Sequence, residues 1–183
     1  MKNRMIPAGY MAKRILNRPE GFENTDVVDI YSISGCMSKN FADYIKFWKH
    51  NSYWFFDSPQ IIQQVAKEHS IELTGTKLFY YEVYNLEFHE DNEWKSFEPE
   101  VALTTDIEKP DLKNLKGYDI VTFSCGNSAE CSPLSCNGLA STIPVNKHCL
   151  LSSFDNARQL LENGNFLNSE PGPYRIMAVY SVL

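Results

Sequence analysis

The sequence lacks the common motifs of nucleotide-binding, hydrolytic and metal-binding proteins. It contains no P-loop, no Rossmann glycine pattern, no G-x-S-x-G motif and no HExxH or paired-histidine metal motif. It has no run of about 18 apolar residues, as a membrane-spanning helix needs, and no continuous apolar stretch near its start, as a secretory signal needs. We therefore expect a cytoplasmic protein without a membrane partner, and nothing in the sequence predicts a cofactor.

Internal repeats and low-complexity tracts are also absent, and 43% of the 183 residues are hydrophobic. That content is enough to bury one core, so residues 1–183 are predicted to form a single globular domain. The five cysteines form an odd number without the regular spacing of a disulfide framework. A chain of this size does not need disulfides to fold, so we expect free thiols.

Charge is distributed unevenly along the chain. The first 18 residues carry five basic side chains and no acidic one, although the whole chain has a net charge of -6. We interpret residues 1–20 as a basic N-terminal arm, with at most a short helix near Tyr10 to Leu16. Ten acidic residues against two lysines lie between Glu82 and Asp111. Such a surface disfavours nucleic acid and anionic lipid and attracts basic partners.

The pattern of apolar residues predicts an α+β fold with a mixed, mostly antiparallel sheet and about three helices. Helices are expected where a capping residue precedes residues at helical spacing: 38–49, from Ser58 and Pro59 to about His69, and from Ser152 or Ser153 to Gly164. Strands are expected at 27–33, 53–56, 77–88, 94–97 and 174–182, the last near the sheet centre. Residues 99–117 are interpreted as a connecting loop. An α/β fold is the alternative, because the early segments alternate strand and helix.

The acidic concentration falls on the hairpin predicted between residues 77 and 97. A basic protein partner would bind this surface, for which we expect six contact residues: Glu87, Glu90, Asp91, Glu93, Trp94 and Glu98. His89 lies among these acids, but consecutive loop residues rarely converge on one ion, and the calcium-loop pattern is missing. A solvated hairpin that keeps the protein soluble is the simpler interpretation.

The stretch from Tyr118 to Leu151 holds four of the five cysteines and His148. Three interpretations are open. Zinc needs Cys125, Cys131 and Cys136 with His148 or Cys149, but their spacings differ from those of ribbons and knuckles, and no metal is predicted. A cysteine nucleophile needs a nearby base, which favours Cys131 or Cys136 with His148 across the loop, because strand neighbours such as His148 and Cys149 point apart. The third interpretation is a loop held by local side-chain to backbone bonds.

Two classes of function therefore stand side by side. The first is a non-catalytic binding protein, for example an immunity or inhibitor protein that presents residues 82–111 to a basic toxin or nuclease. The second is a cysteine-dependent hydrolase or transferase, or a metal-binding protein, that uses the loop 125–149 with His148. Whether the protein is an enzyme depends on what His148 faces.

Overall fold

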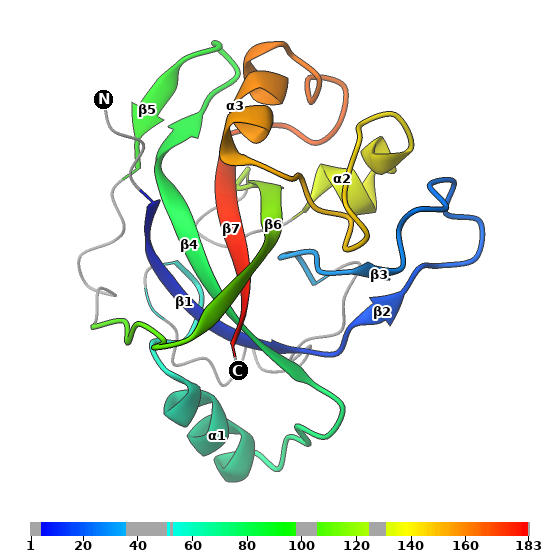
Figure 1. Cartoon of the computed structure of the whole chain (residues 1–183). Coiled ribbons are helices and arrows are strands. Elements are labelled where there is room, and N and C mark those ends of the chain that lie inside the picture. The colour runs from blue at the N-terminus through cyan, green and yellow to red at the C-terminus, as the bar shows by residue number, and fades with distance from the viewer. Residues whose placement is uncertain (1–4, 36–50, 52, 98–105, 125–130, 183) are drawn as a thin grey trace.

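A twisted antiparallel sheet forms the centre of the molecule, with helices packed around it (Figure 1). The computed structural model describes residues 5–35, 51, 53–97, 106–124 and 131–182. Neighbouring strands follow the order β1, β4, β7, β6, and β5 pairs with the end of β4. Their bounds are β1 Met5–Lys13, β4 Lys77–Phe88, β5 Trp94–Ser96, β6 Lys113–Thr122 and β7 Tyr174–Val182. The predicted α+β fold with a mostly antiparallel sheet is confirmed.

Strand β7 lies between β4 and β6, as its apolar sequence predicted. Its first six residues, Tyr174 to Val179, are all buried, because both faces of the sheet are covered along this part of the strand. β4 and β5 form the predicted acidic hairpin, and β4 spans the range expected from the sequence.

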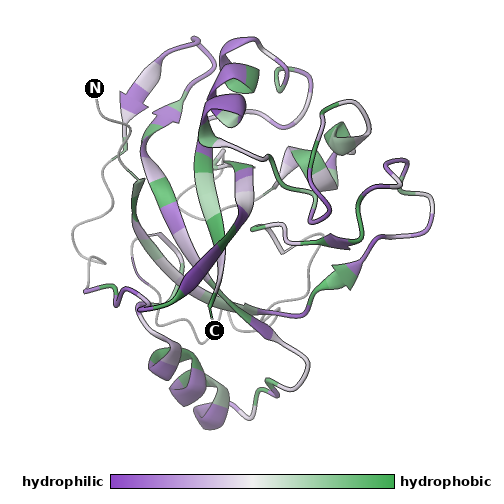
Figure 2. Cartoon of the chain, in the orientation of Figure 1, coloured by the Kyte–Doolittle hydropathy of each residue, from purple (hydrophilic) through white to green (hydrophobic). Residues whose placement is uncertain are grey.

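Helices α1 (Pro59–Glu68) and α3 (Phe154–Glu162) begin where the sequence predicted. The Ser58 and Ser153 side chains accept hydrogen bonds from the first turns of these helices, at 3.4 and 3.2 Å. Each helix turns one hydrophobic side towards the body of the protein (Figure 2). The third helix, α2 (Pro133–Cys136), is one turn long and precedes a 3-10 turn, η3 (Leu139–Ser141). In the described residues, no helix is long and apolar enough to cross a membrane.

A close approach at Gly117 joins the loop before α3 to the sheet. Gly117 has φ of 147°, and a Cβ there would lie 2.7 Å from both the Leu150 side chain and the Leu151 carbonyl. Glycine therefore allows Tyr118 and Leu151 to exchange backbone hydrogen bonds of 2.9 and 2.8 Å. This contact fixes the loop that carries His148 against β6.

Four predicted elements differ from the structure. The short helix near Tyr10 to Leu16 is wrong, because residues 5–13 form β1, which pairs with β4 in the sheet. Of the strand predicted at 27–33, only β3 (Asp29–Ile30) forms, paired with β2 (Leu16–Asn17). Instead of a strand at 53–56, the Asn51 side chain accepts from the backbone at 53 and 55 and makes a turn. The loop predicted at 99–117 gives way to β6 at residue 113. The helix predicted at 38–49 lies outside the described residues.

Candidate functional site

Asn146 shapes the loop that presents His148. Its side-chain oxygen accepts from the backbone N–H groups of His148 at 2.9 Å and Leu150 at 3.3 Å, and its amide donates to the Lys116 carbonyl at 2.7 Å. Cys149 adopts φ of 59° in the same turn, a left-handed conformation that is rare outside glycine, asparagine and aspartate. The loop is therefore a defined turn, and the strand geometry expected for His148 and Cys149 does not apply.

The segment around β3 is bonded to this turn through the backbone. Val28 and Asp29 both donate to the Lys147 carbonyl, at 2.8 and 3.2 Å, and Tyr31 donates to the His148 carbonyl at 3.1 Å. These bonds bring residues separated by more than a hundred positions into one place. Asp29 and Tyr31 consequently flank His148.

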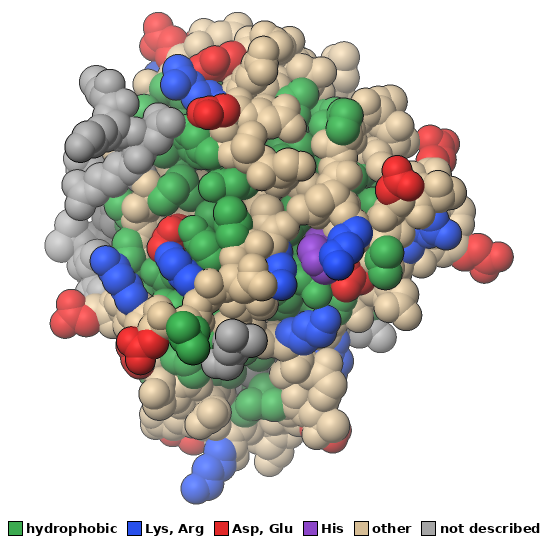
Figure 3. All heavy atoms as spheres, viewed as in Figure 1, with side chains coloured by type: hydrophobic (Ala, Val, Ile, Leu, Met, Phe, Trp, Pro, Cys, Tyr) green, Lys and Arg blue, Asp and Glu red, His purple; other side chains and the backbone are tan. Residues whose placement is uncertain are grey.

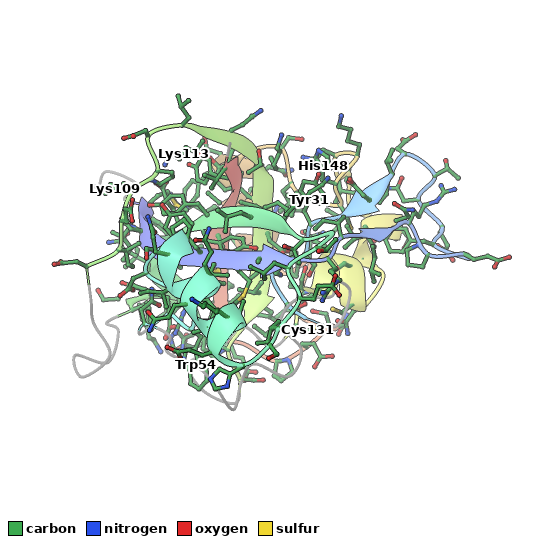
Figure 4. The ribbon with its side chains drawn as sticks, turned by 90° about the horizontal axis from the view of Figure 1, so that it is seen from below. Tyr31, Trp54, Lys109, Lys113, Cys131 and His148 are labelled. Atoms are coloured by element: carbon green, nitrogen blue, oxygen red, sulfur yellow. The ribbon has the colours of Figure 1, made fainter. Side chains whose placement is uncertain are left out.

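Four side chains from these segments and from β4 meet at one point, and we call them the His148 cluster: Asp29, Tyr31, Lys77 and His148. His148 Nδ1 lies 2.5 Å from Asp29 Oδ1, and the imidazole stacks on the Tyr31 ring with centroids 4.1 Å apart and planes inclined by 16°. Lys77 Nζ donates to Tyr31 Oη at 3.1 Å. Figure 4 shows Tyr31 and His148 side by side.

The cluster is partly open to solvent. The side chains of His148 and Asp29 are 14% and 17% exposed, and Lys77 is exposed. The hydrogen bond to Tyr31 raises the pKa of Lys77, so its ammonium is charged at neutral pH. Among the described residues, His148 Nε2 has no hydrogen-bond partner. A carboxylate on Nδ1 with a bare Nε2 is the arrangement in which imidazole accepts a proton from a substrate or water.

Behind the cluster lies a second group of polar side chains, the Lys13–Asp119 network, which also includes Ser132. Lys13 Nζ donates to the carbonyl oxygens of Ser32 (2.5 Å) and Ile33. Asp119 accepts from the Ile33 backbone at 2.9 Å and from Ser132 Oγ at 2.6 Å. Lys13 and Asp119 are both fully buried. These bonds hold Ser32 and Ile33, directly after Tyr31, between β1 and β6.

Burial perturbs both charged groups of this network. It lowers the pKa of Lys13 to about 7, although the charge of Asp119 acts in the opposite sense. It raises the pKa of Asp119 to about 6, against the hydrogen bonds from Ser132 and Ile33. Strongly perturbed groups of this kind gather at functional sites, because such sites need charges that the rest of a core avoids.

The two loop cysteines predicted as nucleophiles do not pair with His148. Figure 4 shows Cys131 well away from His148, and Cys131 Sγ donates to Asn137 Oδ1 at 3.1 Å. Cys136 is disulfide-bonded, so it is not a free thiol, and the expectation of reduced cysteines is wrong at this position. Cys131 and Cys149 form no disulfide. Sequence spacing cannot show which side chains fold back onto each other, which is why the base was assigned to the wrong partner.

Burial raises the pKa of the Cys149 thiol to about 12, and the nearby charge of Asp119 adds to this effect. Such a thiol is inert as a nucleophile at neutral pH. In the described part of the chain, no group of three or more histidine, cysteine or acidic side chains is placed to hold a metal ion. Cys125, which the zinc interpretation requires, lies outside that part.

Three of the six residues predicted to contact a basic partner do not support that role: two are engaged within the protein, and one lies outside the described residues. Glu87 forms an ion pair with the buried Arg175, with nitrogen to oxygen distances of 2.9 and 3.0 Å, and also contacts His89. Trp94 packs its half-buried indole against Phe88 and donates to a glutamate of α3. Glu98 lies outside the described residues.

The other three, Glu90, Asp91 and Glu93, are exposed on the turn between β4 and β5. Asp91 pairs with Lys95 at 2.5 Å across the turn. A hollow of about 400 Å³ lies beside them, lined by His89, Glu90, Asp91, Gly172 and Pro173. In Figure 3, acidic and basic side chains lie next to each other at this end of the molecule, over β5 and α3.

No protein-family model, curated protein or solved structure matches this chain, so its function has to be inferred from its own geometry. His148 was predicted from the sequence as a site residue, but its partners Asp29, Tyr31 and Lys77 were not. A signal for the buried network was present. Asp119 is a single charge inside an apolar strand sequence (YDIV), and Lys13 ends the apolar stretch of β1, next to Arg14. A charge that is buried in such a place must be paired or functional.

Proposed function

We propose that the protein is an enzyme in which His148 acts as the general base of a hydrolysis or group-transfer reaction. The observation that carries this proposal is the 2.5 Å contact between Asp29 Oδ1 and His148 Nδ1, which leaves Nε2 without a partner among the described residues. The proposal retains His148, which was predicted from the sequence as the base, but gives it Asp29 as a partner in place of a loop cysteine.

The division of labour within the cluster follows from its geometry. Asp29 holds the proton on Nδ1, so Nε2 takes a proton from water or from a substrate hydroxyl while the oxygen attacks an electrophilic carbon or phosphorus atom. The imidazolium that forms is stabilised by the Asp29 carboxylate and then returns the proton to the leaving group. The Tyr31 ring fixes the plane of the imidazole, and its 4.1 Å stacking distance allows little tilt.

The arrangement of the chain also supports a functional role. The four side chains come from three segments: Asp29 from β3 and Tyr31 directly after it, Lys77 from β4, and His148 from the 146–150 turn. Backbone or side-chain hydrogen bonds fix each of these segments. A catalytic group needs such independent support, because small displacements cost large factors in rate.

The test is a screen of chromogenic esters, phosphate esters and glycosides with the wild-type protein and three variants. His148→Asn keeps a donor near Asp29 but removes Nε2, and we expect it to abolish any activity found. Asp29→Asn should lower kcat by about 10²-fold or more, because the tautomer is no longer enforced. His69→Asn, at the exposed end of α1, is the matched control and should retain full activity. Activity that survives His148→Asn would refute the proposal.

A second candidate function is binding of a basic protein by the exposed turn, as an immunity or inhibitor protein would bind a toxin or nuclease. Its support is the exposure of Glu90, Asp91 and Glu93 on one turn, where Glu90 and Asp91 also line a hollow. Charge of one sign on a protruding turn speeds association with a partner of the opposite sign, and salt weakens this effect.

This candidate is tested by reversing the three carboxylates of the turn to lysine and measuring association with a basic partner recovered by co-purification. The variant should associate more slowly, and its rate should lose the salt dependence. Reversal of three exposed acids elsewhere, Glu20, Glu23 and Asp26, makes the same change in net charge and should have little effect. Equal effects of both triple variants would show that no specific surface is involved.

A further inference from the structure

The unused hydrogen-bonding capacity of the His148 cluster consists mainly of donors. Lys77 Nζ has three N–H groups, of which one is used on Tyr31 Oη. Tyr31 accepts that bond, so its own O–H remains available, and the described residues provide no acceptor for it. A ligand that completes these bonds must supply acceptor oxygens.

These donors stand next to the proposed base. Lys77 Nζ lies 5.3 Å from the centroid of the Tyr31 ring, and the imidazole of His148 stacks on the same ring at 4.1 Å. One small molecule can therefore reach the ammonium, the phenol and the imidazole together. The phenol links Lys77 to His148, since it bonds Lys77 through its oxygen and touches the imidazole through its ring.

The charge of the cluster changes during the proposed reaction. At rest, the Lys77 ammonium is balanced by the Asp29 carboxylate, which lies close enough to support the charged form of Lys77. Once His148 has taken a proton, two positive charges face one carboxylate, and the cluster is positive overall. A negatively charged substrate would be held most tightly at that stage, which is where binding energy accelerates a reaction.

We propose that the substrate carries an oxyanion, a carboxylate or a phosphate, that binds Lys77 Nζ and Tyr31 Oη beside His148 Nε2. This inference rests on the proposed function for the role of His148, but the anion site itself is defined by Lys77 and Tyr31. A single ammonium with a neutral phenol matches a ligand with two or three acceptor oxygens on one centre.

The experiment is a titration of the isotope-labelled protein with inorganic phosphate and, separately, with acetate, following the ring signals of Tyr31 and His148 by NMR. We expect a saturable change with at least one anion, and the tighter one identifies the class of substrate. Lys77→Gln should weaken binding at least tenfold, and Tyr31→Phe should weaken it several-fold while keeping the stacked ring. Lys67→Gln, on the exposed face of α1, should leave binding unchanged. The backbone spectrum of each variant reports whether the fold is intact.

Absence of a saturable change with both anions, or equal loss in the Lys67 and Lys77 variants, would overturn the anion site. The result is separable from the enzyme proposal. Anion binding that depends on Lys77 while activity survives His148→Asn would leave the site standing and remove the assigned base. If the wild type binds neither anion but His148→Asn abolishes its activity, the assigned base stands and the anion site is removed.

Discussion

Replacing Asp119 by asparagine should change how the stability of the protein depends on pH. Burial raises the pKa of this carboxyl from 3.8 to about 6 in the folded protein. Because the folded state binds the proton more tightly than the unfolded chain, the stability that Asp119 contributes is complete below its unfolded pKa. It is lost as the pH rises through about 6. At ~1.4 kcal/mol per pKa unit, the loss is ~2 kcal/mol between about pH 4 and 6.5.

The assay is urea unfolding, followed by tryptophan fluorescence, of the wild type and the Asp119→Asn variant across this pH range. Asparagine carries no charge, so we expect the free energy of unfolding of the wild type to fall relative to the variant by ~2 kcal/mol. A constant offset from altered hydrogen bonds to Ser132 and Ile33 does not affect this slope. The exposed Asp26→Asn is the control and should run parallel to the wild type. The assignment of a desolvated carboxylate would be refuted if the difference in free energy of unfolding between the two proteins did not change with pH. It would also be refuted if the wild type became more stable relative to the variant as the pH rises.

Lys13 should show the opposite pH dependence. Burial lowers its pKa from 10.5 to about 7. Its contribution to stability is therefore complete above the unfolded pKa and is lost as the pH falls towards about 7. Between about pH 6 and 7, Asp119 and Lys13 are both charged in the folded protein, and the burial of each charge then lowers the free energy of unfolding.

Three further predictions concern the surroundings of the site. Glu87→Gln leaves the Arg175 guanidinium, 4% exposed, without its carboxylate, and should lower the free energy of unfolding by ~3–5 kcal/mol in urea; adding Arg175→Met should restore much of it. Iodoacetamide at mildly alkaline pH should label Cys131 long before Cys149, whose raised pKa and burial suppress the thiolate, as peptide mass spectrometry would show. Equal rates would contradict the burial. Gly117→Ala should lower the stability of the protein in thermal unfolding by ~1–3 kcal/mol or more, because the added Cβ clashes with its neighbours at a positive φ that strains alanine. An unchanged stability would contradict the close approach at Gly117.

Local signals in the sequence predicted the elements whose boundaries depend on local chemistry. The Ser58-Pro59 start of α1, the Ser153 cap of α3 and the apolar run of β7 were all readable, because capping and burial pattern act over a few residues. The strand predicted at 27–33 was too long, because residues next to β3 bond to a loop more than a hundred residues away in the sequence. No local rule shows that the 146–148 turn will supply the partner carbonyls.

The candidate site divides in the same way. His148 was singled out from its sequence surroundings, but its partner Asp29 depends on a contact between residues 119 positions apart. The cysteines drew attention because of their number in one stretch, yet reactivity follows exposure and neighbours, which only the fold determines. Neither Lys13 nor Asp119 was predicted as a site residue, although Asp119 is a charge within an apolar strand sequence and the cost of burying a charge requires a partner for it.

The proposed enzyme depends on Asp29 holding the imidazole proton of His148 on Nδ1 and leaving Nε2 free to accept one. A long-range correlation spectrum between imidazole protons and nitrogens, recorded at mildly alkaline pH, reports which nitrogen is protonated. The structure predicts the Nδ1–H form in the wild type and a shift towards the Nε2–H form in Asp29→Asn. An Nε2–H imidazole in the wild type would contradict the account, because that nitrogen could not act as the base.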